Sequence, residues 1–225
     1  MSKINKSFFI TATGTGIGKT FVTCALCHQL KKAGTDIFAI KPIISGWEDS
    51  DTDTHKIITS LGLSASQQNI EKISPWRFKA PLSPNIAAEK EKRTIDFAEL
   101  VGFCQKSQAE NQALLIEGVG GLMVPINNDK TVLDLIKQLK IPAILVAGTY
   151  LGSINHTLLS INAMNQAGIK IQAIILSQSS ECAGLDETYR TLRNFTDTKI
   201  ITIPYLEESI NIWDKVPDIT NIMEN

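Results

Sequence analysis

Short apolar runs alternate along this chain with longer segments in which apolar residues recur every three or four positions. The short runs are typical of buried strands, and the longer segments are typical of helices that pack one face against a sheet. We therefore predict strands at residues 7–11, 36–40, 113–116, 143–147, 171–176 and 199–203, and helices at residues 20–33, 53–61, 95–111, 131–139, 153–167 and 186–195.

Two segments interrupt this alternation. Residues 45–53 are polar and contain glycine, which predicts a loop, and residues 73–85 carry three prolines, which predict an irregular excursion. Thr94 is expected to open the helix that follows, with Asp96 in its first turn.

Strands that alternate with helices predict an α/β fold, in which right-handed crossovers connect parallel strands. We expect a doubly wound, mostly parallel sheet with helices on both faces and with the second strand beside the first. No repeat, low-complexity segment or linker divides the 225 residues, so residues 1–225 are interpreted as a single domain. Open sheets of this kind bind ligands beyond the carboxyl ends of their strands.

Net charge and hydropathy limit the kinds of binding partner that the chain is expected to have. The chain has 22 basic and 23 acidic residues, a balance that gives no electrostatic reason to expect nucleic acid or an anionic membrane. The apolar run at residues 8–10 is too short for a secretory signal, and the longest one, 141–146, is too short to span a bilayer. We expect a cytoplasmic protein that acts on small molecules.

Cysteine and histidine residues show no metal-site pattern. Two of the four cysteines have redox-motif spacing but lie inside a predicted helix, and no second pair completes a zinc site. We interpret the cysteines as buried thiols and the histidines as solvated or capping residues. They are Cys24, Cys27, Cys104 and Cys182, and His28, His55 and His156.

The strongest local signal lies between the first strand and the first helix, where residues 13–20 read Thr-Gly-Thr-Gly-Ile-Gly-Lys-Thr. Glycines in this setting let backbone N–H groups turn toward phosphate oxygens, and the helix N-terminus adds positive potential. Lys19 would reach the β- and γ-phosphates, and the Thr20 hydroxyl would ligate Mg²⁺. The pattern predicts a phosphate-binding loop for a nucleoside triphosphate, with an unliganded glycine-rich turn as the alternative.

Other polar residues that follow strands complete the candidate site. Glu117 ends an apolar strand and could bind Mg²⁺, which favours one or two carboxylates together with phosphate oxygens and water. Asp53 is the candidate for a second carboxylate, with a helix cap as its alternative role and Asp51 as a rival. Lys41 follows the second strand and is predicted to stabilise charge on a transferred phosphoryl group or an anionic substrate. A surface lysine and a solvated strand end are the alternatives for Lys41 and Glu117.

With these residues in place, the chain resembles the dethiobiotin synthetases of the biotin pathway over nearly its whole length. The combination of a phosphate loop with Lys-Pro-x-x-Ser-Gly and Glu-Gly-x-Gly-Gly, in this order, is specific. The motifs that carry the resemblance are residues 13–20, 41–46, the Asp53 helix, 81–84, 117–121, 151–156 and 203–206.

The resemblance implies a P-loop NTPase-like fold and an ATP- and Mg²⁺-dependent ring closure. Carbon dioxide adds to one amine of 7,8-diaminononanoate, the resulting carbamate oxygen attacks the γ-phosphate, and the second amine displaces phosphate to form the cyclic urea. Lys19 and Lys41 would neutralise the developing charge, and Thr20, Asp53 and Glu117 would hold Mg²⁺. Such chemistry depends on placement and electrostatics and needs no enzyme nucleophile.

The resemblance also implies a homodimer in which the substrate carboxylate meets a helix N-terminus across the interface. The implied substrate-binding residues are Ser45, Thr15, Gly152, Ser153, Ile154, Asn155 and Tyr189. The implied nucleotide-binding residues are Thr15, Gly16, Ile17, Gly18, Lys19, Thr20, Phe21, Asp53, Glu117, Gly118, Val119, Gly120, Ser177, Gln178, Pro204, Tyr205 and Leu206.

The chain departs from the family pattern at Gly16, where other members carry an acidic residue, and at Ala12, where a glycine is common. It also has Ser177 and Gln178 where an asparagine that reads adenine is often found, so the choice of nucleotide base stays open. One alternative function is a nucleotide-switched partitioning or division-site ATPase, but those proteins add a lysine early in the loop and often a basic membrane-binding tail. A second alternative, an amide-forming ligase, would need an ammonia-generating domain for which 225 residues leave no room.

Overall fold

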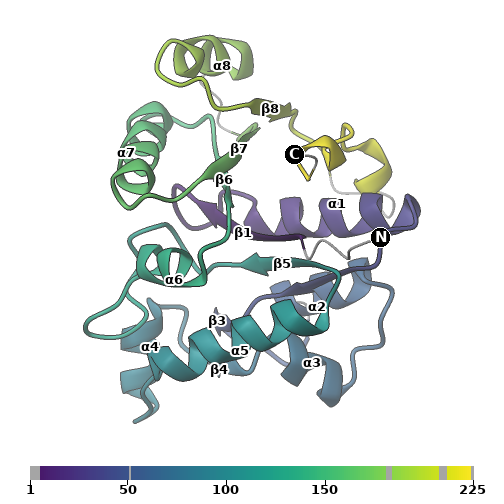
Figure 1. Cartoon of the computed structure of the whole chain (residues 1–225), viewed down its shortest axis with the longest axis vertical. Helices are drawn as coiled ribbons and strands as arrows, with labels where there is room; N and C mark the ends of the chain where they lie inside the picture. Colours follow the sequence, from purple (N-terminus) through teal and green to yellow (C-terminus); the bar gives the residue numbers. More distant parts are fainter. Residues whose placement is uncertain (1–5, 51, 181–183, 208–211, 224–225) are drawn as a thin grey trace.

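The computed structural model describes residues 6–50, 52–180, 184–207 and 212–223. Its centre is a six-stranded sheet in the order β2-β5-β1-β6-β7-β8 (Figure 1). Each pair of neighbouring strands in this sheet is parallel, which confirms the predicted α/β class. The strands are β1 (Lys6–Ala12), β2 (Ile37–Ile40), β5 (Ala113–Glu117), β6 (Ala143–Ala147), β7 (Ile171–Ser177) and β8 (Ile200–Ile203).

The sheet order corrects one expectation, because β2 does not lie beside β1. Strand β5 is inserted between them and pairs with both, so that Ile10 of β1 stands opposite Glu117 and Ile40 of β2 stands opposite Ile116. The carboxyl ends of β2, β5 and β1 therefore meet at one edge of the sheet. This edge is where an open α/β sheet binds its ligand.

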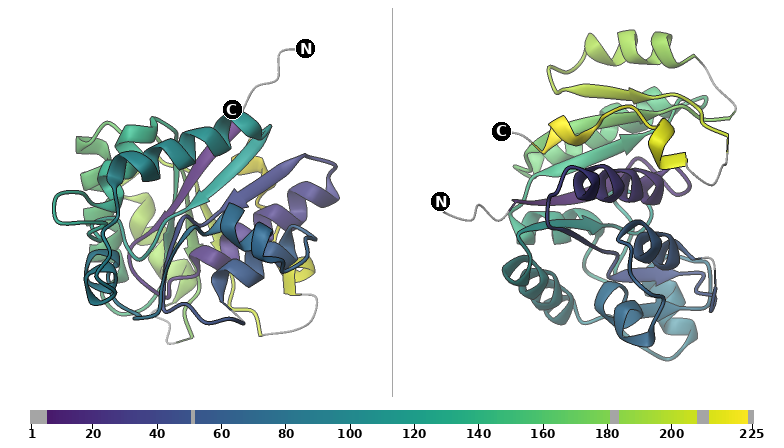
Figure 2. Two further views of the ribbon diagram at one scale, coloured as in Figure 1. Left: turned by 90° about the horizontal axis from the view of Figure 1, so that it is seen from below. Right: turned by 90° about the vertical axis from the view of Figure 1, so that its right-hand side faces the viewer.

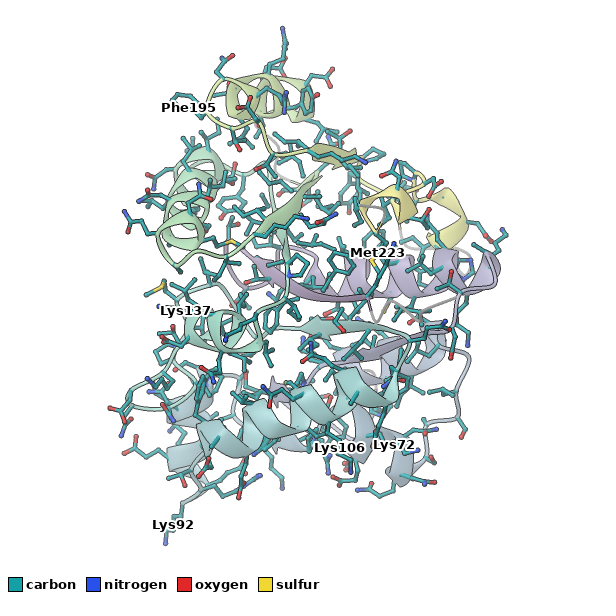
Figure 3. All side chains as sticks on the ribbon, viewed as in Figure 1. Lys72, Lys92, Lys106, Lys137, Phe195 and Met223 are labelled. Atoms are coloured by element: carbon teal, nitrogen blue, oxygen red, sulfur yellow. The ribbon has the colours of Figure 1, made fainter. Side chains whose placement is uncertain are left out.

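Alternate residues of each central strand enter different cores, as the period of two in a strand requires. In β1, Phe8, Ile10 and Ala12 belong to one apolar cluster, whereas Phe9 belongs to the other. Helices cover both faces of the sheet (Figure 2), and apolar side chains fill the space between the layers (Figure 3). The lysines labelled at the periphery of Figure 3, such as Lys72 and Lys106, are exposed.

The six predicted helices are present, with boundaries shifted by a few residues. They are α1 (Lys19–Lys32), α2 (Asp53–Ser60), α5 (Phe97–Glu110), α6 (Val132–Leu139), α7 (Ser153–Gln166) and α8 (Leu185–Arg193). Helix α5 starts two residues later than predicted, and Asp96 is its N-cap, which accepts hydrogen bonds from the backbone N–H groups of Ala98 and Glu99. Asp96 was expected inside the first turn, but an aspartate carboxylate satisfies free N–H groups better from the cap position.

The segment between α2 and α5 is more regular than predicted. It contains α3 (Gln67–Ile73), β4 (Trp76–Phe78) and α4 (Pro84–Lys90), and β4 forms a small parallel sheet with β3 (Ile43–Ser45), which precedes α2. Prolines that suggested an irregular chain occupy compatible positions, since Pro84 stands at the first residue of α4. Ser45, which was predicted to begin a loop, is the last residue of β3.

Residues 212–223 lie along α1 and contain two short 3₁₀ helices, η1 (Ile212–Lys215) and η2 (Thr220–Ile222) (Figure 1). The side chain of Gln29 holds this segment. Its Nε2 donates to the carbonyls of Val216 and Pro217, and its Oε1 accepts from the N–H of Ile219. Ile219 and Ile222 are buried in the same cluster as the inner face of α1. Among the described residues, no helix is long and apolar enough to cross a membrane.

Truncation of a central core side chain tests this packing. Leu115 of β5 is fully buried, so Leu115→Ala should lower the free energy of unfolding by about 2–5 kcal/mol. Leu63, which is 38% exposed, is the matched control, and Leu63→Ala should cost about 0.5 kcal/mol. Denaturant unfolding followed by circular dichroism measures both values. Equal losses for the two variants would contradict the assigned core.

Candidate active site

The segment between β1 and α1 forms a glycine-rich loop that lines a cavity at the N-terminus of α1. Gly18 caps the N-terminus of α1 at φ 99°, a left-handed conformation that side chains other than glycine rarely adopt. Helix α1 begins at Lys19, directly after this turn, and its first N–H groups point out of the helix end. The loop therefore offers backbone donors and a helix N-terminus in one place, which is the arrangement that binds phosphate.

Lys19 is the first residue of α1, directly after this loop, and is 6% exposed. Its Nζ donates to the carbonyl of Gly14 at 3.1 Å. Burial, and after it the charge of Lys41, lower the pKa of Lys19 to about 8, against the opposing effect of Glu117 and Asp53. Without a bound anion, the Lys19 ammonium therefore loses its proton more easily than an exposed lysine does. A bound anion would stabilise the protonated form.

Lys41 is not a surface residue, since it is 4% exposed. Its Nζ bonds both to Asp53 and to Oε1 of Glu117, the latter at 2.7 Å. Burial opposes the charge of Lys41, but the two carboxylates outweigh burial and raise its pKa. Lys41 therefore carries a full positive charge at neutral pH, between two anionic partners.

Glu117 is likewise not a solvated strand end, because it is 1% exposed. Its Oε1 accepts from Thr20 Oγ1 and from Lys41 Nζ, each at 2.7 Å. Its Oε2 is buried and has no hydrogen-bond partner among the described residues. A buried carboxylate oxygen without a donor or a cation is costly, so Oε2 marks a place where a further positive group would be stabilised.

Asp53 is the first residue of α2, and Thr52 rather than Asp53 is the N-cap of that helix. The Asp53 side chain is 39% exposed and faces Lys41. Burial raises the pKa of Asp53, but Lys41 and the hydroxyl of Thr20 outweigh burial and lower it below its usual value. Asp51, the rival for the same function, lies outside the described residues.

Lys19, Lys41 and Asp53 line a cavity of about 290 Å³ at the carboxyl ends of β1, β2 and β5, and Glu117 lies behind its wall, bonded to Lys41 and Thr20. The cavity brings both lysines, the Asp53 carboxylate, the Thr20 hydroxyl and Ser45 to one space. Ile44 also lines it and was not among the predicted site residues, since nothing in an apolar strand sequence shows which residue faces a ligand. The lining residues are Thr15, Gly16, Gly18, Lys19, Thr20, Phe21, Lys41, Ile44, Ser45, Asp53, Val119 and Gly120.

The glycine-rich turn after Glu117 runs close to the rest of the site. A Cβ atom on Gly118 would lie 2.8 Å from Cε1 of Phe9, so no other residue fits without displacing the core. The N–H of Gly118 donates to the carbonyl of Ile10, which fixes the turn to β1. This close approach places Val119 and Gly120 on the cavity wall.

The ends of β7 and β8 form a second wall near the phosphate loop. A Cβ atom on Gly18 would lie 3.5 Å from Oγ of Ser177. Gln178 does not simply face outward, because its Oε1 accepts from the N–H of Tyr205 at 3.1 Å and its own N–H donates to the carbonyl of Ile203. The Gln178 side chain thus ties the segment that holds Tyr205 to the end of β7.

The predicted carboxylate-binding residues do not line this cavity. Gly152 caps α7 at φ 95°, Ser153 is buried, and Asn155 is exposed at the start of that helix. Tyr189 of α8 is half-buried and packs against the apolar cluster on the other side of the sheet. Next to them Leu151 is 94% exposed.

The donor atoms around the cavity suit a hard divalent cation. Among the described residues, no three His, Cys, Asp or Glu side chains cluster as in an all-protein metal centre. The oxygen atoms that are present, from Asp53, Glu117 and Thr20, match the few protein ligands that Mg²⁺ uses when phosphate and water complete its shell. The unpaired Oε2 of Glu117 fits the same interpretation.

The cysteines were predicted to be buried thiols and the histidines to be solvated or capping residues. Cys182 lies outside the described residues, and the structure describes the others. Cys24, Cys27 and Cys104 are buried free thiols, and burial raises the pKa of each. Among the histidines, His28 bonds to Asp214, His156 to the hydroxyl of Tyr150, and His55 to Thr52 at the cap of α2.

The fold and the loop define the chain as a P-loop nucleotide-binding protein, and a family model described as an AAA domain matches residues 6–212. Comparison with known proteins narrows this class further. The chain is 38% identical over 213 residues to the ATP-dependent dethiobiotin synthetase BioD of Caulobacter sp. (strain K31), with 92% of this chain and 90% of that protein covered. The chain belongs to the family of ATP-dependent dethiobiotin synthetases.

A second relative supports the family, and a solved structure supports the fold. The BioD protein of Legionella pneumophila subsp. pneumophila (strain Philadelphia 1) is 42% identical over 192 residues, with 83% of this chain and 87% of that protein covered. The MinC:MinD cell division complex of Aquifex aeolicus superposes with a TM-score of 0.57 at 14% identity, with 93% of this chain and 86% of that chain covered. At such low identity, the second likeness shows a shared fold and no shared activity.

The depressed pKa of Lys19 predicts a pH dependence of nucleotide binding. Bound phosphate raises that pKa, so above about pH 8 binding must take up a proton that the free protein has lost. ATP affinity should therefore fall with increasing pH, by up to about tenfold per pH unit, between about pH 8 and the pKa of the complex. Calorimetry in buffers of different ionisation enthalpy measures both the affinity and the proton uptake.

The matched control for this measurement is Lys19→Arg, whose guanidinium stays protonated over the whole range. The variant should bind ATP with little dependence on pH. An affinity that declines equally in the two proteins would show that another group titrates.

Proposed function

We propose that this enzyme carboxylates 7,8-diaminononanoate with CO₂ and closes the ureido ring of dethiobiotin through a carbamate–phosphate intermediate, releasing ADP and phosphate. The observation that carries the proposal is the cavity in which two lysines and the Asp53 carboxylate face a phosphate loop. Together with the family assignment, these groups support a site that transfers a phosphoryl group to an anionic acceptor.

Lys19 and Lys41 are the proposed catalytic groups. The carbamate and the γ-phosphate are both anionic, so their approach is opposed by charge repulsion. Two buried ammonium groups in one cavity offset that repulsion, and they act strongly because little water screens them. In the transition state, charge moves onto the oxygen atoms between the acceptor and the leaving ADP, where Lys19 would donate.

Mg²⁺ is the proposed metal, held by Thr20, Asp53 and Glu117. When bound, it would neutralise charge on the phosphate oxygens and help to align them. Glu117 is the last residue of β5 and is fixed by the sheet, and its Oε2, which has no hydrogen-bond partner among the described residues, supports a ligand role. Lys41 already contacts both carboxylates, which supports their arrangement around a cationic centre.

The nucleotide would lie along the loop with its phosphates over Thr15, Gly16, Ile17 and Gly18 and with Phe21 and Val119 beside them. For the base, we propose the wall formed by Ser177 and the Pro204–Leu206 segment. Its support is the closeness of Ser177 to Gly18 and the hydrogen bond that fixes Tyr205 to Gln178. That hydrogen bond occupies the Gln178 carbonyl oxygen, which favours a positioning role for Gln178.

For the diamine, we propose Ser45 and Thr15 near the reacting amines, since both line the cavity. The distal carboxylate would bind at the start of α7, through residues 152–155, with Tyr189 beside it. These residues lie away from the cavity of their own chain, which supports a homodimer in which one protomer completes the site of its partner. The exposed Leu151 at the same helix start supports a contact there.

We propose further that residues 1–225 form one synthetase domain that acts in the cytoplasm on small molecules, without nucleic acid or membrane as a partner. The near-zero net charge supports the absence of both partners. The free buried thiols among the described residues suit a reducing compartment.

The reaction itself tests the proposal. Purified protein with 7,8-diaminononanoate, bicarbonate, Mg²⁺ and ATP should release phosphate only when the diamine is present, and mass spectrometry should detect dethiobiotin in equal amount. Omission of bicarbonate after degassing is the control. Folded protein that binds ATP but shows no diamine-dependent phosphate release would falsify the enzymatic proposal.

Replacement of Lys41 tests its assignment as a catalytic group. Lys41→Ala should lower kcat by about 100-fold or more, because an electrostatic donor to the transition state is lost. ATP affinity, measured by calorimetry, should change far less. Turnover close to that of the original protein would remove Lys41 from the catalytic residues.

Two controls accompany this variant. Lys32→Ala removes a lysine whose side chain is 73% exposed on α1, and it should leave turnover unchanged. Circular dichroism at the assay temperature gives the folded fraction of Lys41→Ala, which is needed because the change leaves the buried Glu117 without its ion-pair partner.

A further inference from the structure

Beside the Asp53 end of the cavity, two side chains from different elements contact the ring of Trp47. The His55 ring of α2 lies 5.5 Å from it between ring centroids, with the ring planes at 26°. The guanidinium carbon of Arg77, from β4, lies 5.2 Å from the Trp47 ring centroid. We call Arg77, Trp47 and His55 the planar stack. None of the three belongs to the catalytic or binding groups described above.

One end of the planar stack holds the start of α2. Nδ1 of His55 accepts a hydrogen bond from the backbone N–H of Thr52 at 3.3 Å and lies 2.8 Å from Oγ1 of the same residue. His55 thereby completes a capping box with the N-cap Thr52. Glutamate or glutamine usually occupies this third helical position. A histidine adds what they lack, a flat ring that packs on Trp47.

The other end is fixed to a different part of the fold. Arg77 donates to the carbonyl of Ser74 and pairs with Glu71 of α3. The backbone N–H of Trp47 donates to the carbonyl of Phe78 at 2.9 Å. The planar stack therefore connects the first turn of α2 to α3 and to the small β3–β4 sheet.

The two carboxylates of the site differ in how they are held. Glu117 is buried at the end of a central strand, so the sheet itself fixes it. Asp53 has a side chain that is 39% exposed, and it is the first residue of α2 and not part of the sheet. Its position depends on the geometry of the first helical turn, where Thr52 precedes it and His55 follows two residues later.

We propose that His55 is a positioning residue that holds Asp53 in place for the metal, with Trp47 keeping the His55 ring at the cap. This inference rests on the proposed role of Asp53 as a metal ligand. Partners of metal ligands commonly matter for affinity nearly as much as the ligands do. His55 acts through the backbone of residues 52–53, so it affects the metal without touching it.

The test measures how ATP binding depends on Mg²⁺, by calorimetry at a series of Mg²⁺ concentrations. His55→Phe keeps a ring next to Trp47 but loses the acceptor, and it should raise the half-saturating Mg²⁺ concentration about tenfold. His55→Gln keeps an acceptor at the capping position and should recover most of that loss. His28→Phe, on the outer face of α1, is the matched control and should leave the Mg²⁺ dependence unchanged.

A double variant that combines His55→Phe with Asp53→Asn distinguishes a positioning role of His55 from a general effect on the stability of the protein. If His55 acts through Asp53, then His55→Phe should add nothing to the Mg²⁺ requirement of Asp53→Asn. A further rise in the double variant, or no rise for His55→Phe alone, would overturn the positioning role. Trp47→Leu, which leaves His55 intact, should shift the Mg²⁺ dependence in the same direction and provides a second variant if His55→Phe does not fold.

The outcomes distinguish this inference from the proposed function. Absence of Mg²⁺-dependent ATP binding in the unchanged protein would count against the proposed function itself. An Asp53→Asn variant with unchanged Mg²⁺ dependence would overturn both the metal role of Asp53 and the positioning role of His55. A raised requirement in Asp53→Asn, with none in His55→Phe or Trp47→Leu, would overturn the positioning role alone.

Discussion

The site depends on one interaction, the contact of the Lys41 ammonium with the carboxylates of Glu117 and Asp53. Glu117 lies at the end of a central strand where water does not reach, so its charge must be compensated by the protein or by a bound cation. Lys41 supplies part of that compensation from the end of β2, and Thr20 supplies a hydroxyl from α1. A single buried carboxylate thus holds the start of α1 and the end of β2 to β5, where Glu117 lies 97 residues after Thr20 and 76 residues after Lys41.

The sheet order makes this interaction possible. Because β5 lies between β2 and β1, Glu117 stands between the lysine that follows one neighbour and the phosphate loop that follows the other. Parallel pairing brings the ends of all three strands to one edge. The helices on both faces keep that edge rigid by burying alternate residues of each strand in separate cores.

Much of this arrangement could be predicted from the sequence, because strong patterns act locally. The apolar runs predicted the strands, the fold class and the polar residues at the strand ends. The Gly-Lys-Thr loop predicted the phosphate-binding residues. The neighbour of β1 was predicted wrongly, since strand order depends on long-range packing that no local pattern records. Strand β4 and the start of α4 were missed because residues 73–85, with three prolines, were taken as irregular. The capping role of His55 was among those expected of the histidines, but its contact with Trp47 was not predicted, because that contact joins residues that no local pattern relates.

The strap of residues 212–223 over α1 has a consequence for the order in which the protein is built. Helix α1 carries Lys19 and Thr20, and its outer side is completed by Ile219 and Ile222, with Gln29 as the clamp. On the ribosome, these residues emerge after every strand of the sheet. The nascent chain therefore holds its phosphate loop on a helix with an uncovered apolar side until synthesis reaches the strap. Helix α1 is thus the first helix to be synthesised and the last to have its apolar surface covered.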